Sequence, residues 1–96
     1  MQFIYKERYL KRFDHFSADA QALILEADRQ IRIFYATRQA PHGLGITLLY
    51  TKGAERIFEA RASRGIRIVW AKRGDAVSFL LVGLHDDVRN YLRTLR

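Results

Sequence analysis

The sequence predicts an α+β fold in which an N-terminal helix hairpin packs on a small antiparallel β-sheet and a C-terminal helix follows. Two observations lead to this prediction. Apolar residues recur at helical spacing before the segment QAPHGLGI, and short β-rich runs separated by turn signals come after it. With 96 residues, of which 49% are hydrophobic, the chain suits one globular domain. We therefore predict a single domain over residues 1–96.

The first half of the chain predicts a short strand and two helices. QFIY at residues 2–5 has strand character, and the aromatic residues of KERYLKRFDHF then recur at helical spacing. Ser17 is a good N-cap for a second helix, Ala18 to Arg38, which Pro41 and the glycines after it bring to an end. Because a helix of this length is about 30 Å long, we expect it to pack along one face of the sheet.

The second half predicts four strands and a last helix. The strands are the β-branched and aromatic runs Ile46–Thr51, Ile57–Ala62, Ile66–Lys72 and Val77–Leu84. Short links between them permit only antiparallel neighbours. SFLLVGL is apolar on both faces, so we expect this strand to be central in the sheet. The last helix, Asp87 to Leu95, places its apolar residues on one face and its arginines away from it.

The charge of the chain is strongly positive, and arginine supplies most of it. There are 17 Lys and Arg against 10 Asp and Glu, a net charge of +7, and 13 of the basic residues are arginine. The arginine fork matches phosphate with two parallel hydrogen bonds. We interpret the excess, most of which follows residue 51, as a sign of a polyanionic partner. A generally basic surface and an acidic protein partner are the alternatives.

Several classes of protein are disfavoured by what the sequence lacks. Without cysteine there is no disulfide, thiolate nucleophile or zinc–thiolate site. The chain has no apolar run of transmembrane length, and its first residues are too charged for a signal peptide, so we expect a cytoplasmic protein without membrane contact. His15, His42 and His85 share no metal-ligand spacing, and no phosphate-loop or dinucleotide motif occurs. We expect neither a metal nor a cofactor.

The run FEARASRGIRIVW contains a candidate phosphate site. Its SRG segment, residues 63–65, suits a three-residue hairpin loop with Gly65 in the left-handed conformation. That register places Arg61 opposite Arg67, an arrangement that makes sense mainly when an anion lies between the two guanidinium groups. A two-residue loop would instead place these arginines on opposite faces. Glu59 shares a face with Arg61, where it is either a general base or part of a surface salt-bridge ladder.

A second group of candidates follows the last strand. His85 stands at the start of the helix that carries Tyr91. Imidazole titrates near neutral pH and can protonate a leaving group, although a lone histidine is more often structural. Tyr91 lies on the apolar face of its helix, so it suits the core unless its hydroxyl reaches the rim.

In the order of its elements, the whole chain resembles the RelE/ParE toxin superfamily. The motifs lie between residues 58 and 92, where FEAR leads through a short turn to GIRIVW, and VG is followed by a basic residue and an aromatic residue in VGLHDDVRNY. For the RelE branch, the resemblance implies a ribosome-dependent ribonuclease that needs no metal. The 2'-hydroxyl of the A-site codon attacks the adjacent phosphate and gives a 2',3'-cyclic phosphate. The implied partners are a cognate antitoxin, the ribosome and mRNA.

The resemblance also implies roles for individual residues. Arg67 and Arg61 would stabilise the charge of the phosphorane. His85 would protonate the leaving oxygen, and Tyr91 would stack on or orient the nucleotide. Glu59 is the candidate base by position. The remaining candidates for RNA or phosphate binding are Arg64, Lys52 and Arg56.

Two departures from the family pattern keep other functions open. Ile66 replaces the usual aromatic residue, and Ile57 and Glu59 stand where RelE has lysines. The chain is therefore either a toxin with a carboxylate–histidine pair or a weak or inactive relative. A ParE-like inhibitor of DNA gyrase without nuclease activity, and a noncatalytic module that binds RNA or protein, are the alternative functions.

Overall fold

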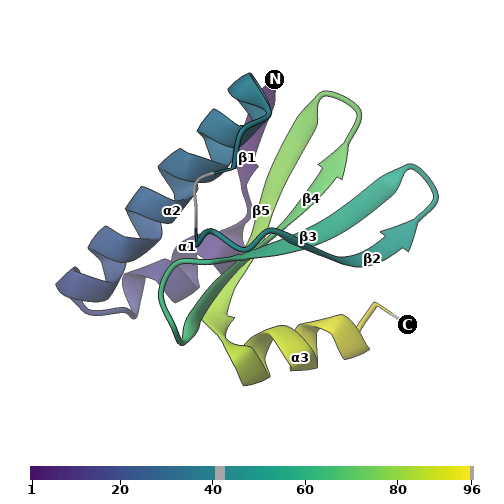
Figure 1. Ribbon diagram of the computed structural model, residues 1–96. Helices are drawn as coiled ribbons and strands as arrows, with labels where there is room; N and C mark the ends of the chain where they lie inside the picture. The colour runs from purple at the N-terminus through teal and green to yellow at the C-terminus, as the bar shows by residue number, and fades with distance from the viewer. Residues whose placement is uncertain (41–42, 96) are drawn as a thin grey trace.

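The computed structural model describes residues 1–40 and 43–95, which form a five-stranded sheet and three helices (Figure 1). In chain order these are β1 (Gln2–Tyr5), α1 (Glu7–Asp14), α2 (Ala18–Thr37), β2 (Thr47–Lys52), β3 (Glu55–Arg61), β4 (Ile66–Arg73), β5 (Ala76–Leu84) and α3 (His85–Arg93). The predicted α+β class is confirmed, and each helix and strand lies within a few residues of its predicted position. Pro41 and His42 lie outside the described residues.

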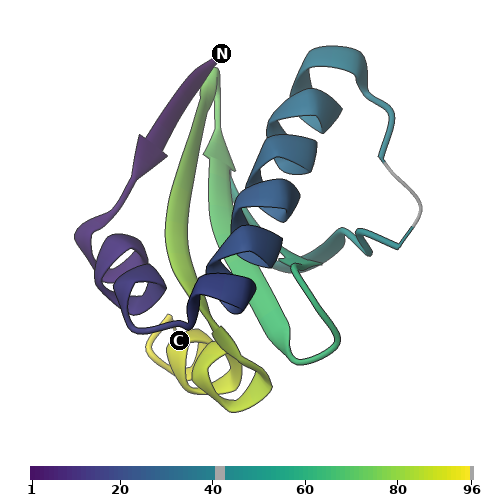
Figure 2. The same cartoon turned by 90° about the vertical axis from the view of Figure 1, so that its left-hand side faces the viewer.

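The strand order is β1-β5-β4-β3-β2, so the prediction that the SFLLVGL strand is central was wrong. The central strand is β4, and β5 lies between it and β1. Strands β2 to β5 are antiparallel, as predicted, whereas β1 runs parallel to β5 in register from Gln2↔Ala76 to Tyr5↔Phe79. Figure 2 shows these two strands side by side. The apolar character of β5 reflects helices packed on both of its faces rather than a central place in the sheet.

Helices α1 and α2 cover one face of the sheet. Ser17 caps α2 by accepting a hydrogen bond from the Ala20 amide at 3.2 Å, and Arg38, in the left-handed conformation with φ 63°, ends it. The core of this face includes the fully buried Trp70, whose indole Nε1 donates to the Tyr35 hydroxyl of α2 at 2.7 Å. The predicted packing of the long helix along the sheet is confirmed.

Helix α3 covers the opposite face. Its Val88 is buried with Ile57, Val69, Ala71 and Leu81 of the sheet. The helix begins at His85, two residues before the predicted start, and the Asp87 carboxylate accepts a hydrogen bond from the Leu84 amide at 2.8 Å. The last strand therefore passes directly into α3, which fixes the first turn of this helix at one end of the sheet.

The turn between β3 and β4 has the predicted register but not the predicted backbone. Arg61 pairs with Arg67, yet Gly65 is not in the left-handed region. Instead the Ser63 hydroxyl accepts a hydrogen bond from the Ile66 amide at 3.2 Å, and the Ala62 amide donates to the Ile66 carbonyl at 2.9 Å. The serine side chain closes the turn, so glycine is not needed in a special conformation.

Candidate functional site

One face of the sheet carries the charged side chains that the sequence singles out on β3 and β4. Glu59 pairs with Val69, and Arg61 pairs with Arg67 two positions along. Val69 belongs to the cluster beneath α3, and side chains alternate between faces along a strand. Glu59 and both arginines therefore project from the same face as α3. The predicted register of the two arginines is confirmed, with their Cα atoms about 4.5–5.5 Å apart, as in any antiparallel pair.

Arg67 has the most unusual environment of these residues. Its side chain is only partly exposed, and its Nε and Nη1 atoms are buried without a hydrogen-bond partner among the described residues. The register places Gly83 of β5 beside it, and the Asp87 side chain of α3 lies over that glycine. Leaving buried donors unpaired costs about 1–3 kcal/mol, and more for a charged group. Such an arrangement favours an anion as the missing acceptor.

The side chain of Arg61 lies against Gly45. A Cβ atom on Gly45, whose φ is 61°, would be 3.3 Å from Arg61 Nε, and the Arg61 amide donates to the Leu44 carbonyl at 2.8 Å. Arg61 also lines a pocket of about 200 Å³ together with residues of α2. Its backbone faces Arg67, but its exposed guanidinium reaches the edge of the sheet beside the segment before β2.

His85 is exposed at the first position of α3. Its Nε2 lies 3.2 Å from Arg89 Nη2 on the next turn. Arginine only donates hydrogen bonds, so Nε2 is the acceptor and Nδ1 carries the hydrogen in this arrangement. A ring held in this way is neutral, and it becomes a proton donor only as the imidazolium, in which both nitrogens carry hydrogen and the Arg89 contact is released. His85 follows Leu84, which pairs with Ile66, so the histidine and Arg67 lie at the same end of the sheet.

Tyr91 of α3 is half-buried against the sheet and α1. Its ring belongs to the cluster beneath α3, and the Arg8 guanidinium lies over it at 5.6 Å from the centroid. Burial raises the pKa of the Tyr91 hydroxyl above its usual value. These contacts give Tyr91 a packing role that holds α3 in place.

The three remaining candidates are exposed and lie in different places. Arg64 is at the tip of the β3–β4 turn, near Arg61 and Arg67 in sequence. Arg56 is near the other end of β3, about 17 Å from Arg61 along the strand at 3.3 Å per residue, and Lys52 lies close to it at the end of β2. Arg56 also projects from the α2 face. The structure therefore brings Arg64 close to the candidate site and leaves Lys52 and Arg56 apart from it.

A pocket that the sequence did not indicate adjoins the start of α3. It has a volume of about 370 Å³ and is lined by Arg12, His15, Phe16 and Leu84. His15 Nδ1 lies 2.7 Å from the Lys11 carbonyl oxygen, and it is the donor because a carbonyl only accepts hydrogen bonds. The Nε2 atom of His15 is therefore the ring nitrogen with the free lone pair. In the sequence, the basic residues of α1 indicate only a helix face exposed to solvent. Their position beside His85 depends on long-range packing of α1 against α3.

Two further structural features are absent from residues 1–40 and 43–95. No group of three or more His, Asp or Glu side chains is arranged to hold a metal ion there. No helix in this part of the chain combines the length and the apolar character that crossing a membrane requires.

Solved structures resemble this arrangement over nearly the whole chain. A chain of the archaeal RelE–RelB complex from Pyrococcus horikoshii has a TM-score of 0.67 at 12% identity, covering 86% of this chain and 92% of that chain. The fold is that of the RelE/ParE toxins. The RelB–RelE antitoxin–toxin complex from Methanococcus jannaschii gives 0.65 at 15% identity, with 92% and 96% of the two chains covered.

Two bacterial toxins extend the comparison with the RelE/ParE fold. A YoeB/ParE toxin from Agrobacterium tumefaciens has a TM-score of 0.62 at 13% identity, covering 88% of this chain and 99% of that chain. The isolated Escherichia coli RelE toxin gives 0.55 at 13% identity, covering 99% and 98%. No protein-family model and no curated protein sequence matches the chain. The expected RelE/ParE resemblance is thus confirmed for the fold, at sequence identities of 12–15%.

Proposed function

We propose that this chain is the toxin of a toxin–antitoxin pair and acts as a ribosome-dependent endoribonuclease on mRNA. The observation that carries the proposal is the guanidinium of Arg67, with buried donors that lack a partner among the described residues. It lies on a sheet face with a second arginine and a carboxylate, at the end where His85 begins α3. A phosphodiester supplies the acceptor oxygens that this guanidinium lacks.

The proposed reaction is an intramolecular transfer at phosphorus that these side chains support without a metal. The 2'-oxygen loses its proton and bonds to phosphorus while the bond from phosphorus to the 5'-oxygen breaks. Arg67 stabilises the negative charge of the phosphorane that develops in the transition state, and Arg61 contributes once its guanidinium turns from Gly45 toward Arg67. The products are a 2',3'-cyclic phosphate and a free 5'-hydroxyl.

Proton transfer in this proposal involves His85 and Glu59. His85 delivers a proton to the departing 5'-oxygen as an imidazolium, which requires release of the Nε2 contact with Arg89, and the ring is left neutral. Glu59 is the proposed base, from its place on the same face as Arg61 and Arg67. We assign Tyr91 the positioning of α3, and a direct stacking contact with the nucleotide remains part of the proposal.

The partner we propose is an antitoxin protein. Two of the similar structures are complexes of RelE with RelB, which supports a partner of this kind. The net charge of +7 suits both an acidic polypeptide and RNA. An antitoxin that covers the Arg67 face would block the substrate, so inhibition and binding would share one surface.

Primer extension on an mRNA translated in a purified system tests the proposal. We expect cuts within A-site codons that require ribosomes and that fall at least about 100-fold in Arg67→Ala and His85→Ala. Arg56→Ala is the matched control, because it removes an exposed arginine from the opposite face and should cleave normally. Intact mRNA with the wild-type chain would overturn the nuclease proposal and favour the ParE-like gyrase inhibitor, which supercoiling assays then test.

A further inference from the structure

An open pocket lies between the end of α1 and the end of β5, next to the first residue of α3. It has a volume of about 370 Å³, within the roughly 300–1,000 Å³ of sites that bind small molecules. Two apolar side chains line it, the partly exposed Phe16 and Leu84, which is 53% exposed. Arg12 and His15 supply polar groups. Apolar walls with a few hydrogen-bonding groups suit a flat ring that carries polar atoms at its edge.

The two polar side chains of the pocket offer a donor and an acceptor. Arg12 forms an ion pair with Asp87 of α3, which holds the guanidinium in place. Because arginine carries five N–H donors, others remain for a ligand. His15 Nδ1 donates to the Lys11 carbonyl, so the lone pair of Nε2 can accept a hydrogen bond. A nucleobase has acceptors and donors on its edges, so it matches both groups.

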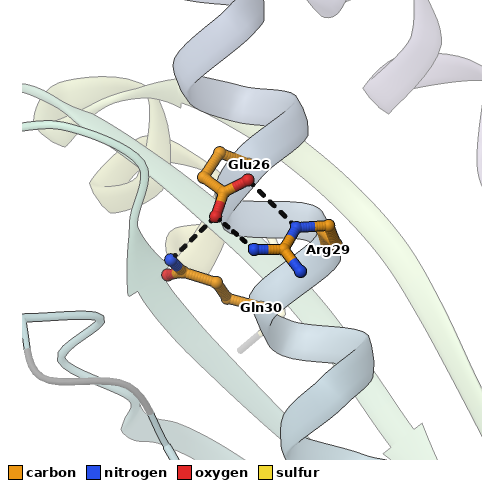
Figure 3. Close-up of polar contacts among 3 residues, drawn as sticks. All are labelled: Glu26, Arg29 and Gln30. Carbon is orange, nitrogen blue, oxygen red and sulfur yellow. Dashed lines mark hydrogen bonds and ion pairs between the residues drawn. The ribbon is translucent and has the colours of Figure 1, made fainter.

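The polar side chains on the outer surface of α2 make a contrast, because they bind one another. Figure 3 shows Arg29 and Gln30 both reaching the carboxylate of Glu26. Arg29 Nε and Nη2 lie 3.0 and 2.7 Å from the two carboxylate oxygens, and Gln30 Nε2 lies 3.1 Å from one of them. Groups that are satisfied in this way gain less from a ligand than Arg12 and His15 do.

The pocket lies beside the candidate site at the end of the sheet. Gly83 pairs with Arg67, Leu84 follows Gly83, and His85 then begins α3. Side chains alternate along a strand, so Leu84 projects from the face of α1 and α2, whereas Arg67 projects from the face of α3. In the proposed reaction His85 protonates the 5'-oxygen of the nucleotide on the 3' side of the cleaved bond. The base of that nucleotide is therefore the one that the pocket can reach.

We propose that this pocket binds the base of the nucleotide on the 3' side of the cleaved phosphodiester. Phe16 stacks on the base, and Arg12 and His15 form hydrogen bonds with its edge. The subsite rests on the proposed ribonuclease function, which places the RNA phosphate at Arg67. A base held in the pocket keeps the departing oxygen of its own nucleotide close to His85, so binding contributes to alignment of the reacting groups.

NMR titration of the purified chain with short RNA tests the proposal. The probes are dinucleotides whose upstream ribose is 2'-O-methylated, so that they are not cleaved, and whose downstream nucleotide either has a base or is abasic. The wild-type chain should bind the complete dinucleotides at least about 10-fold more tightly than the abasic one, because stacking is lost without the base. The backbone amide signals of His15 and Phe16 should shift with the complete dinucleotides and not with the abasic one.

Two substitutions remove contacts with the base and spare the core. Phe16→Leu keeps an apolar side chain without the aromatic ring, and Leu84→Ala shortens an exposed one. Each should reduce the preference for the complete dinucleotides to less than about 3-fold and leave the affinity for the abasic one unchanged. Leu48→Ala is the matched control, because Leu48 of β2 is 52% exposed and should bind both probes like the wild type. Circular dichroism of every variant establishes that the fold is intact.

Arg67→Ala separates the subsite from the proposed function. It removes the phosphate contact, so it should weaken binding of complete and abasic dinucleotides to the same extent. A base preference that survives while Arg67→Ala binds both probes like the wild type would support the subsite and contradict the phosphate site. Equal binding of complete and abasic dinucleotides by the wild-type chain would overturn the subsite. So would pocket variants that keep the full preference, since the pocket would then suit a protein partner instead.

Discussion

Arg12 Nη2 lies 2.5 Å from Asp87 Oδ2, and this ion pair joins the last turn of α1 to the first turn of α3. The same carboxylate oxygen accepts the Leu84 amide hydrogen bond. A second contact between the helices is made where Arg8 lies over the Tyr91 ring. Helix α3 is thus held by α1 as well as by the sheet, and its first turn presents His85.

Asp87→Ala is expected to destabilise the protein by about 1–2 kcal/mol. It removes both the helix cap and the ion pair with Arg12. Arg12→Ala removes only the ion pair and should cost less than about 1 kcal/mol, because both side chains are partly solvated. Urea denaturation of the two variants and of the double mutant separates the two contributions. Equal stability of Asp87→Ala and wild type would show that neither the cap nor the ion pair contributes to the free energy of unfolding.

Gly83→Ala is expected to disturb the junction between β5 and α3. A Cβ at this buried position would lie 2.8 Å from the Asp87 Cβ and 2.9 Å from its Oδ2. We expect a loss of about 1–3 kcal/mol in the free energy of unfolding, the usual cost of overpacking. The double mutant with Asp87→Ala should lose less stability than the sum of the two single losses, because the carboxylate no longer obstructs the new methyl group although the Cβ of residue 87 remains. Additive effects of the two substitutions in denaturation experiments would count against a direct clash.

Arg67→Met is expected to leave the free energy of unfolding unchanged or to raise it by about 1–2 kcal/mol. The buried donors of Arg67 lack partners among residues 1–40 and 43–95, so methionine removes a desolvation cost while filling similar space. Under the proposed function, RNA cleavage is lost in the same variant. Thermal denaturation and primer extension on one preparation measure both effects. A variant that is inactive because it has unfolded would contradict this prediction.

Alkaline pH is expected to destabilise the fold. Burial raises the pKa of Tyr5, Tyr9, Tyr35 and Tyr91 above the usual value of 10. Their protons are held more tightly in the folded chain, so the stabilisation is complete below pH 10 and declines as pH rises above it. Each such tyrosine contributes a slope of up to about 1.4 kcal/mol per pH unit. Urea denaturation between pH 8 and 11 measures the slope, which Tyr9→Phe should reduce.

Most of the fold was predictable because its signals are local. The apolar spacing of α2 and the Ser17 cap lie within one segment, and each strand pair from β2 to β5 joins neighbours in sequence. The pairing of β1 with β5 was not predictable. A strand of four residues carries little pattern, and its partner, which begins at Ala76, is more than 70 residues away.

The candidate site was likewise predictable where it depends on local sequence and unpredictable where it depends on distant segments. The register of Arg61 and Arg67 was readable, since a short hairpin turn sets it. The contribution of α1 was not, because the position of Arg12 beside Asp87 depends on how two distant helices pack. The path of the Arg61 side chain over Gly45 also depends on a segment that precedes β2. Backbone pairing can be inferred from sequence, whereas the direction of a long side chain requires its neighbours.

The parallel pairing of β1 with β5 has a consequence for synthesis of the chain. The first strand is translated more than 70 residues before its partner. Until Phe79 has left the exit tunnel, β1 has no strand to join and the aromatic side chains around Tyr5 stay exposed. Closing such a long loop is slow relative to local pairing. We therefore expect nascent chains to remain incompletely folded, and the surface of Arg67 to be unformed, until β5 has emerged.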